Sequence, residues 1–125
     1  MAPIAASRHV TVRQAHVYIM ASGRNGTLYV GVTGDLVRRI WEHREGTIEG
    51  FTRRYGIKTL VWYEAQSDFD TAIRREKAIK AWQRAWKLRL IEAVNPEWND
   101  LWPTLFGEGK SVEQWLHDAF GDRSE

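Results

Sequence analysis

Two early segments of the chain, 16–20 and 28–33, are rich in β-branched and aromatic residues and are separated by a short polar stretch. This pattern predicts two β-strands, in which successive side chains point to opposite faces. The stretch between them contains Asn25-Gly26, a dipeptide typical of tight hairpin turns. We therefore expect the chain to begin its fold with an antiparallel hairpin.

The apolar spacing then becomes helical within residues 35–44, and Gly46 follows as a stop signal. Residues 45–56 are polar and predict an exposed loop. A third strand is predicted at 58–65. Beyond the helix-start sequence Ser67-Asp68, the helical pattern runs to about Val94, and Gln83 or Arg84 is the candidate position for a break into two helices.

The predicted order β-β-α-β-α-α corresponds to an α/β (α+β) fold, with a small three-stranded, mainly antiparallel sheet flanked by helices. A last helix is expected at 112–120 as part of a C-terminal helical extension. We expect an N-terminal tail at 1–14, one domain at 15–101 and an acidic extension at 102–125.

Composition narrows the function classes. The 125 residues include no cysteine, which excludes disulfides, thiolate zinc sites and a thiol nucleophile. The chain shows no signal-peptide core and no apolar run of about 18 residues that would span a membrane, so we expect a soluble, cytoplasmic protein.

Charge is distributed unevenly along the chain. Residues 1–94 hold 16 Lys and Arg against 9 Asp and Glu, whereas residues 95–125 hold 2 against 7. A basic domain of this kind suits a polyanionic partner such as nucleic acid. Charge alone fits a solvated surface without a partner equally well.

Strand alternation places Tyr29 and Gly31 on one face of the predicted sheet. Tyr18, on the partner strand, reaches the same face if the register allows it. On the first helix, Arg39 and His43 are four residues apart and share a face, where they are suited to hold a phosphate oxygen and relay a proton. Packing tyrosines, a surface arginine and a partly exposed histidine are the simpler explanation of each pair alone.

Glu76 lies within an apolar stripe of the later helix. A carboxylate that faces a sheet needs a cation, because burying an unpaired charge is costly. One candidate is a hard metal ion such as Mg²⁺, which a single protein carboxylate can hold together with water and a substrate phosphate. The other is an ion pair with Arg74, Arg75 or Lys80.

Together these residues resemble the GIY-YIG nuclease superfamily, and most closely its small single-domain branch, related to the catalytic module of the excision-repair endonuclease. His16-Val17-Tyr18 is similar to the first motif and Tyr29-Val30-Gly31 to the second. The resemblance covers about residues 15–101. His16 replaces the first glycine of the family pattern, and Val32 stands where some members carry a basic residue.

The resemblance implies a metal-dependent DNA endonuclease that uses one divalent ion, Mg²⁺ or Mn²⁺. It implies Glu76 as the metal ligand, Arg39 as the stabiliser of the transition state with His43 assisting, and Tyr18 or Tyr29 as the base. The substrate-binding residues expected around them come from four parts of the chain: Gly31, Arg38, Arg53-Arg54-Tyr55 and Asn99.

Two rival functions remain open from the sequence. One is a nucleic-acid-binding module that keeps the fold without cleavage, and the other is a partner-binding protein that uses the region of Trp98, Trp102 and Trp115. The substrate form is left open among duplex, single-stranded, branched and damaged DNA, as are the oligomeric state and the identity of a targeting partner protein.

Overall fold

The computed structural model describes residues 14–47 and 50–106 of the chain. The predicted order of elements is confirmed, and the predicted helix at 112–120 lies outside the described residues. The elements, in chain order, are β1 (Ala15–Ala21), β2 (Leu28–Thr33), α2 (Leu36–Glu45), α3 (Phe51–Arg54), β3 (Thr59–Gln66), α4 (Phe69–Ala81), α5 (Arg84–Val94) and the 3-10 helix η1 (Trp102–Leu105).

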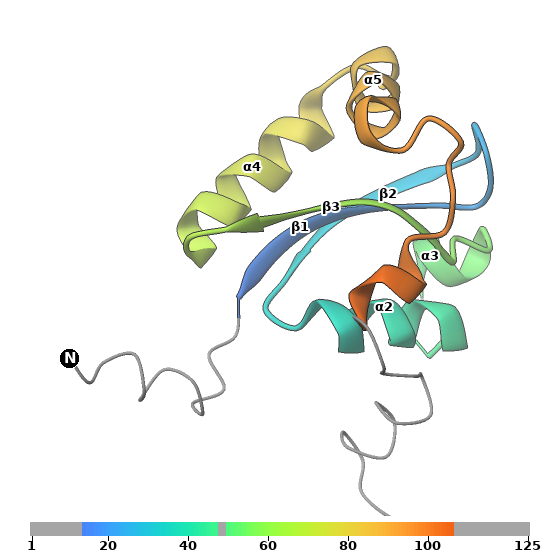
Figure 1. Cartoon of the computed structure of the whole chain (residues 1–125), viewed down its shortest axis with the longest axis horizontal. Helices are drawn as coiled ribbons and strands as arrows, with labels where there is room; N and C mark the ends of the chain where they lie inside the picture. The colour runs from blue at the N-terminus through green and yellow to red at the C-terminus, as the bar shows by residue number, and fades with distance from the viewer. Residues whose placement is uncertain (1–13, 48–49, 107–125) are drawn as a thin grey trace, which may run out of the picture.

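The sheet is antiparallel throughout and has the order β2-β1-β3. Helices α4 and α5 cover one face, and α2, α3 and η1 lie on the other (Figure 1). The expected fold class, a small three-stranded antiparallel sheet flanked by helices, is confirmed.

The central strand β1 explains why one short sheet supports two cores. Its residues from Val17 to Ala21 are buried on both faces. Val17 and Ile19 join the cluster under α4 and α5, whereas Tyr18 and Met20 join the cluster under α2. Full burial of such a side chain contributes about 1.5–3 kcal/mol, so β1 is the main source of cohesion between the two helical layers.

Capping residues define the helices that carry chemistry. Asp35 accepts a hydrogen bond from the Arg38 N–H at the start of α2, and Gly46 ends this helix with a φ of 75°. Asp68 caps α4 by accepting from the Thr71 N–H, and this bond lowers the pKa of the Asp68 carboxyl. Helix α4 ends at Ala81 and α5 begins at Arg84, which confirms the break near these positions.

The prediction of a continuous exposed loop at 45–56 was wrong in one part. Residues 51–54 form the short helix α3, and Thr52 is buried although its neighbours Phe51, Arg53 and Arg54 are exposed. A single helical turn has no apolar repeat, so the sequence pattern carries no signal for it.

A bulge in β3 links the sheet to the end of α5. Ile19 pairs with Trp62 and Met20 pairs with Leu60, which leaves Val61 without a partner in β1. The Asn95 amide donates to the Val61 carbonyl over 3.1 Å. Asn95 is 3% exposed, and it also donates to the Asn99 carbonyl and accepts from the Asn99 N–H.

Asp100 holds the segment after α5 against the outer edge of β3. Its carboxylate accepts from the Leu60 N–H and from Arg44 of α2 at 2.6 Å. The Leu101 N–H in turn donates to the Leu60 carbonyl. Trp102 follows and is buried in the cluster under α2, so the packed chain continues past the predicted boundary at 101 to Phe106. The domain limits themselves stay a prediction.

The three hydrogen bonds of the Asn95 side chain generate a stability prediction. Asn95→Ala leaves the Val61 and Asn99 backbone groups unpaired, and each unsatisfied buried group costs about 1–3 kcal/mol. We expect the free energy of unfolding in urea to fall by at least about 2 kcal/mol, since more than one such group is affected.

Asn99→Ala is the matched control within the same turn, because the Asn99 residue is exposed and only its backbone is held by Asn95. Its unfolding free energy should stay within about 0.5 kcal/mol of wild type. Equal losses of unfolding free energy in the two variants would contradict the assignment of Asn95 as the residue that hydrogen-bonds the Val61 carbonyl at the bulge.

Candidate active site

The site begins at the one cross-strand pair where a tyrosine faces a glycine. Tyr18 of β1 pairs with Gly31 of β2. A Cβ atom on Gly31 would lie 2.5 Å from both Cζ and Oη of Tyr18, far inside van der Waals contact, so the ring occupies the space that a side chain would need. The register brings Tyr18 and Tyr29 to the same face, with ring centroids 6.2 Å apart.

Helix α2 brings His43 to these phenols. The Tyr18 hydroxyl lies 3.1 Å from His43 Nε2, and the Tyr29 ring lies 5.5 Å from the His43 ring. The other ring nitrogen, Nδ1, lies 3.2 Å from Thr52 Oγ1 of α3. His43 is therefore buried and doubly hydrogen-bonded rather than partly exposed. Thr52 was missed by the sequence analysis.

Arg39 lies one turn before His43 and hydrogen-bonds the Tyr18 hydroxyl. A guanidinium can only donate, so towards Arg39 the Tyr18 hydroxyl is the acceptor. Between Tyr18 and His43 Nε2, and between His43 Nδ1 and Thr52, the donor is set by the tautomer of the ring. The four side chains form one connected set of hydrogen bonds.

Burial sets the protonation of this chain. Desolvation, followed by the nearby Tyr29 and Glu76, raises the pKa of Tyr18 to about 12, although Arg39 opposes the change. Desolvation and then the charge of Arg39 lower the pKa of His43 to about 4. For Arg39, burial is the largest single effect and would lower the pKa, but Tyr18, Tyr29 and Glu42 together outweigh it and raise the pKa. At neutral pH, Tyr18 and His43 are both neutral and Arg39 is charged.

Glu76 approaches from the opposite side of the sheet, on α4. The residue is 8% exposed, and its carboxylate contacts the Lys80 ammonium at 2.6 Å. Its charge acts on the Tyr18 hydroxyl, which places the two residues within electrostatic range. Tyr18, Tyr29, Arg39 and His43 thus form one cluster, which we call the phenol cluster, and Glu76 is coupled to it.

The expected substrate-binding residues are distributed more widely. Arg38 contacts Asp35 at the start of α2, over 3.6 Å. Arg53, Arg54 and Tyr55 are exposed on and just after α3, which also carries Thr52. Asn99 lies in the turn beyond α5. Its backbone N–H and carbonyl bond to the Asn95 side chain, away from the phenol cluster.

The donor set limits which metal could bind. Among residues 14–47 and 50–106, no three His, Cys, Asp or Glu side chains converge as a metal site would require. A lone buried carboxylate suits Mg²⁺ or Mn²⁺, which keep water and phosphate oxygens as most of their ligands. It does not suit a structural zinc ion, which needs four protein ligands.

Comparison with known proteins agrees with this geometry. The GIY-YIG catalytic domain family matches residues 14–89, which include the whole phenol cluster and Glu76. The chain belongs to the GIY-YIG family. It therefore carries the catalytic domain of a nuclease superfamily, whose substrates are nucleic acids.

Its relatives include UPF0213 proteins from several bacteria. One from Pseudomonas aeruginosa (strain UCBPP-PA14) is 37% identical over 78 residues, covering 62% of this chain and 74% of the relative. One from Aeromonas salmonicida (strain A449) is 29% identical over 94 residues, covering 74% and 68%. The solution structure of a UPF0213 protein from Bacillus halodurans covers 70% of this chain and 92% of its own, at 30% identity and a TM-score of 0.46.

Within the described segments, no helix combines the length and the hydropathy that a membrane crossing needs.

The low pKa of His43 generates a prediction about stability and pH. A histidine in the unfolded chain has a pKa of 6.5, and folding lowers the value to about 4. Between these pH values the unfolded state holds a proton that the folded state lacks, so stability falls as pH falls from 6.5 towards 4. One such group contributes a slope of up to about 1.4 kcal/mol per pH unit.

His43→Gln should flatten this part of the pH dependence, measured by urea unfolding at several pH values from 7 to 4.5. His16→Gln is the control, because His16 also has a pKa lowered by burial but contacts Tyr63 and Gln14 rather than the phenol cluster. A His43→Gln profile that matches wild type would show that the ring takes up its proton equally in both states.

Proposed function

We propose that the protein is a metal-dependent DNA endonuclease that hydrolyses phosphodiester bonds. The observation that carries the proposal is the convergence of Arg39, Tyr18, Tyr29 and His43, with Glu76 coupled to them from the other face of the sheet. A purely structural cluster has no need of an arginine whose side chain remains 39% exposed beside two phenols. An arginine held this way can bind a phosphate and retain its charge.

Glu76 would hold the divalent ion, Mg²⁺ or Mn²⁺. When bound, such an ion supplies Lewis-acid polarisation of the scissile phosphate and stabilises the leaving 3′ oxygen. Lys80 now provides the positive charge that a buried carboxylate requires. Since the Lys80 side chain is 53% exposed, it can return to water at little cost when another cation takes its place.

The reaction is an addition of water to the phosphorus and a departure of the 3′ oxygen, which leaves a 5′-phosphate and a 3′-hydroxyl. Arg39 stabilises the extra negative charge on the phosphate in the transition state. Tyr18 is a poor base, because its proton is held with a pKa of about 12 and its hydroxyl already bonds to His43. Tyr29, which is half-buried, is the residue we assign as base towards the attacking water. As the phenolate it takes one proton from the water and becomes the phenol, and the departing 3′ oxygen takes a proton from solvent.

His43 acts through the tyrosines rather than on the water. Its Nε2 is used by Tyr18 and its Nδ1 by Thr52, so neither nitrogen is available for direct proton abstraction. The neutral ring fixes the Tyr18 hydroxyl and lies against Tyr29. We assign His43 and Thr52 as positioning residues.

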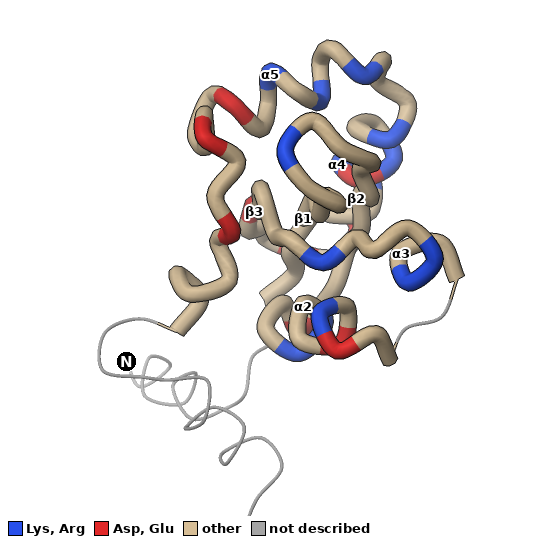
Figure 2. Tube along the Cα trace, turned by 90° about the vertical axis from the view of Figure 1, so that its right-hand side faces the viewer, with Lys and Arg blue, Asp and Glu red and all other residues tan. Residues whose placement is uncertain are grey.

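The charge distribution favours a nucleic-acid partner. Lys and Arg lie along α4, at the start of α5 and on α3, whereas Asp and Glu gather near the end of α5 and in the segment after it (Figure 2). Arg53, Arg54 and Tyr55 on the α3 side, together with Arg38 and Gly31, are proposed to contact the DNA near the cut. Asn99 remains a proposed contact farther along the chain. We further propose a cytoplasmic protein that relies on a partner protein for targeting to branched or damaged DNA.

The rival proposal is a nucleic-acid-binding module without cleavage. Binding alone requires only basic residues. Burying the Glu76 carboxylate near Tyr18 costs free energy that such a module would have no reason to spend, which favours the enzyme. The partner-binding rival that uses tryptophans is weaker, because Trp98 and Trp102 are buried in the two cores.

Metal binding supplies a test that does not depend on cleavage. Mn²⁺ should raise the melting temperature of wild type and leave Glu76→Gln unchanged, because a ligand stabilises only a native state that binds it. In EDTA the melting temperatures of the two proteins should differ little. The Glu76→Gln substitution removes a charge that is costly to bury, and the exposed Lys80 side chain can become hydrated, so the loss of their ion pair has little effect on stability.

Lys80→Gln extends this test, with Lys77→Gln as the control. Both substitutions remove one positive charge from α4, but only Lys80 pairs with Glu76 in the described structure. The midpoint for Mn²⁺ should fall about fivefold in Lys80→Gln, since one charge at 4 Å in water is worth about 1 kcal/mol. A Glu76→Gln protein that still gains stability from Mn²⁺ would remove Glu76 as the ligand.

Cleavage itself is measured on a panel of linear, branched, damaged and single-stranded DNAs with Mg²⁺, Mn²⁺ or EDTA. Arg39→Ala should lower the single-turnover rate by about 10²–10³ while the dissociation constant for DNA changes little, because its contact strengthens in the transition state. Tyr29→Phe should reduce the rate more than Tyr18→Phe, because it removes the hydroxyl assigned as base. Tyr18→Phe removes a hydroxyl with a positioning role and keeps the ring above Gly31.

Binding of DNA by wild type without any cleavage across this panel would favour the binding-module rival. If Tyr18→Phe is slower than Tyr29→Phe, the assignment of the two phenols is reversed. An Arg39→Ala variant with parallel losses of affinity and rate would make Arg39 a docking residue only.

A further inference from the structure

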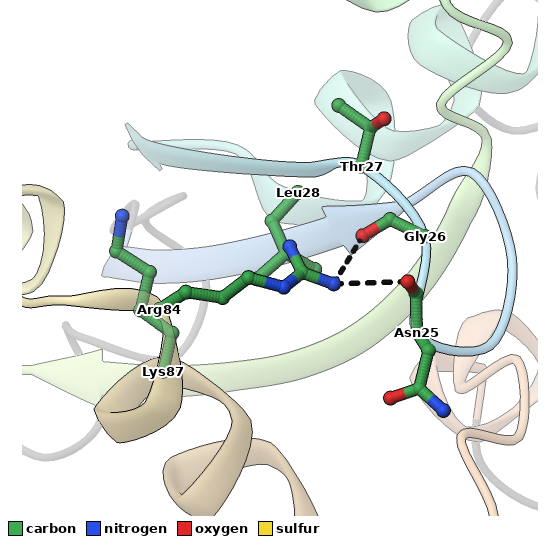
Figure 3. Close-up of a pocket in the computed structure, with 6 residues that line it drawn as sticks. All are labelled: Asn25, Gly26, Thr27, Leu28, Arg84 and Lys87. Carbon is green, nitrogen blue, oxygen red and sulfur yellow. Dashed lines mark hydrogen bonds between the residues drawn. The ribbon is translucent and has the colours of Figure 1, made fainter.

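A second basic feature lies on the α5 side of the sheet, away from the phenol cluster. A groove of about 550 Å³ separates the β1–β2 hairpin from the start of α5 (Figure 3). Its lining comes from two segments distant in sequence: Asn25, Gly26, Thr27 and Leu28 of the hairpin, and Arg84 and Lys87 of α5. We call it the hairpin groove.

Arg84 is fixed across this groove. One of its terminal nitrogens donates to the carbonyls of Asn25 and Gly26, at 2.9 and 2.8 Å. Figure 3 shows the side chain extended from α5 to the hairpin, with both bonds drawn. The two carbonyls are neutral, so the guanidinium keeps its full charge, and its remaining N–H groups are left for a ligand.

Lys87 adds a second positive charge one turn further along α5. It has no ion pair or hydrogen bond within residues 14–47 and 50–106, and the groove lining includes no acidic residue. Arg24, on the same hairpin, is paired with Glu97 over 3.3 Å. Two cations beside an open groove, with no carboxylate in its lining, form a site for an anion such as a phosphate of the sugar-phosphate backbone.

The groove and Glu76 lie on the same side of the sheet, because α4 and α5 cover one face and the phenol cluster lies under α2 on the other (Figure 1). Lys80 beside Glu76 and Arg84 in the groove are four residues apart along the chain, so their Cα atoms are at most about 14 Å apart. On β2, Leu28 at the groove and Gly31 under the Tyr18 ring are three residues apart, and alternation turns them to opposite faces of the sheet. A nucleic-acid strand rises about 3.4 Å per nucleotide, so a backbone held in the groove lies within a few nucleotides of a phosphate at Glu76.

We propose that the hairpin groove binds the sugar-phosphate backbone of the nucleic acid within a few nucleotides of the phosphate at the active site. The proposal rests on the proposed nuclease function and adds a second, sequence-independent contact to it. Lys87 is the better residue to substitute, because Arg84 also holds the hairpin in place and its removal would disturb the fold. The groove therefore sets affinity and position on the strand, and it takes no part in the chemical step.

The test compares Lys87→Ala with Arg89→Ala. Both remove one positive charge from α5, but residues two apart on a helix lie about 200° apart around its axis. Arg89 is exposed and lines a separate hollow with Trp82 and Trp86. Binding of the best-cleaved DNA is measured in EDTA over a range of salt concentrations, and single-turnover cleavage is measured at saturating protein.

Lys87→Ala should weaken binding and lower the steepness of the salt dependence by about 0.9 for duplex DNA, the value for one phosphate contact. When the phosphates near the cut are ethylated one at a time, one within a few nucleotides of it should weaken binding to wild type and have no further effect on Lys87→Ala. The cleavage rate at saturation should match wild type. Arg89→Ala should retain the wild-type salt dependence and the wild-type interference pattern.

Equal effects of Lys87→Ala and Arg89→Ala, or an unchanged salt dependence in Lys87→Ala, would overturn the groove as a binding site while leaving wild-type cleavage intact. A Lys87→Ala protein with a slower rate at saturation would overturn its separation from the chemical step. If wild type neither binds nor cuts any DNA or RNA offered, the proposed nuclease function fails and the groove proposal fails with it. Melting temperatures of the two variants within a few degrees of wild type establish that the fold is retained.

Discussion

The missing side chain at Gly31 is the constraint on which the candidate site depends. Only a glycine leaves room for the Tyr18 ring to lie across β2, since any Cβ would approach the ring to 2.5 Å. From that position the Tyr18 hydroxyl meets His43 of α2 and the charge of Glu76 from α4. One backbone position thus allows residues from both faces of the sheet to act on the same small volume.

The site also shows how a buried polar cluster is kept stable before any ligand arrives. Each member has a partner: Arg39 bonds to Tyr18, Tyr18 to His43, His43 to Thr52, and Glu76 to Lys80. Neutral Tyr18 and neutral His43 avoid the cost of burying two further charges. The two charges that remain, on Arg39 and Glu76, are those that a phosphate and a metal ion would need, and the partially exposed Arg39 and Lys80 side chains can adjust to their arrival.

The elements with a strong repeat were predictable from the sequence, and the contacts that depend on tertiary packing were not. Strand β2 and the start of α2 at Asp35 follow from alternation and helical spacing, whereas the sequence offered Gln83 or Arg84 for the break before α5 without deciding it. Helix α3 was missed because four residues contain no repeat. The sequence also left open whether Tyr18 shares a face with Tyr29, since register depends on pairing rather than on either strand alone.

Two residues illustrate the same limit within the functional region. Thr52 lies in a polar stretch that reads as exposed, yet packing of α3 against α2 turns its hydroxyl to His43. Asn99 was expected from the family resemblance, whereas the buried asparagine of that turn is Asn95. The Asn95 amide binds the Val61 carbonyl at the bulge in β3, and no sequence pattern predicts that bulge. Side chains whose role is to satisfy another element's backbone are visible only when both elements are in place.

The attachment of residues 100 and 101 to β3 has a consequence for encounters between molecules. At Leu60 the outer N–H and C=O groups of the sheet are both taken, by Asp100 and Leu101 of the same chain. A free strand from another molecule would need to displace a segment whose effective concentration, set by a short tether, is on the order of millimolar or higher. The β3 edge of the sheet is thereby shielded at this position against edge-to-edge association, without the need for a charged or proline-bearing edge strand.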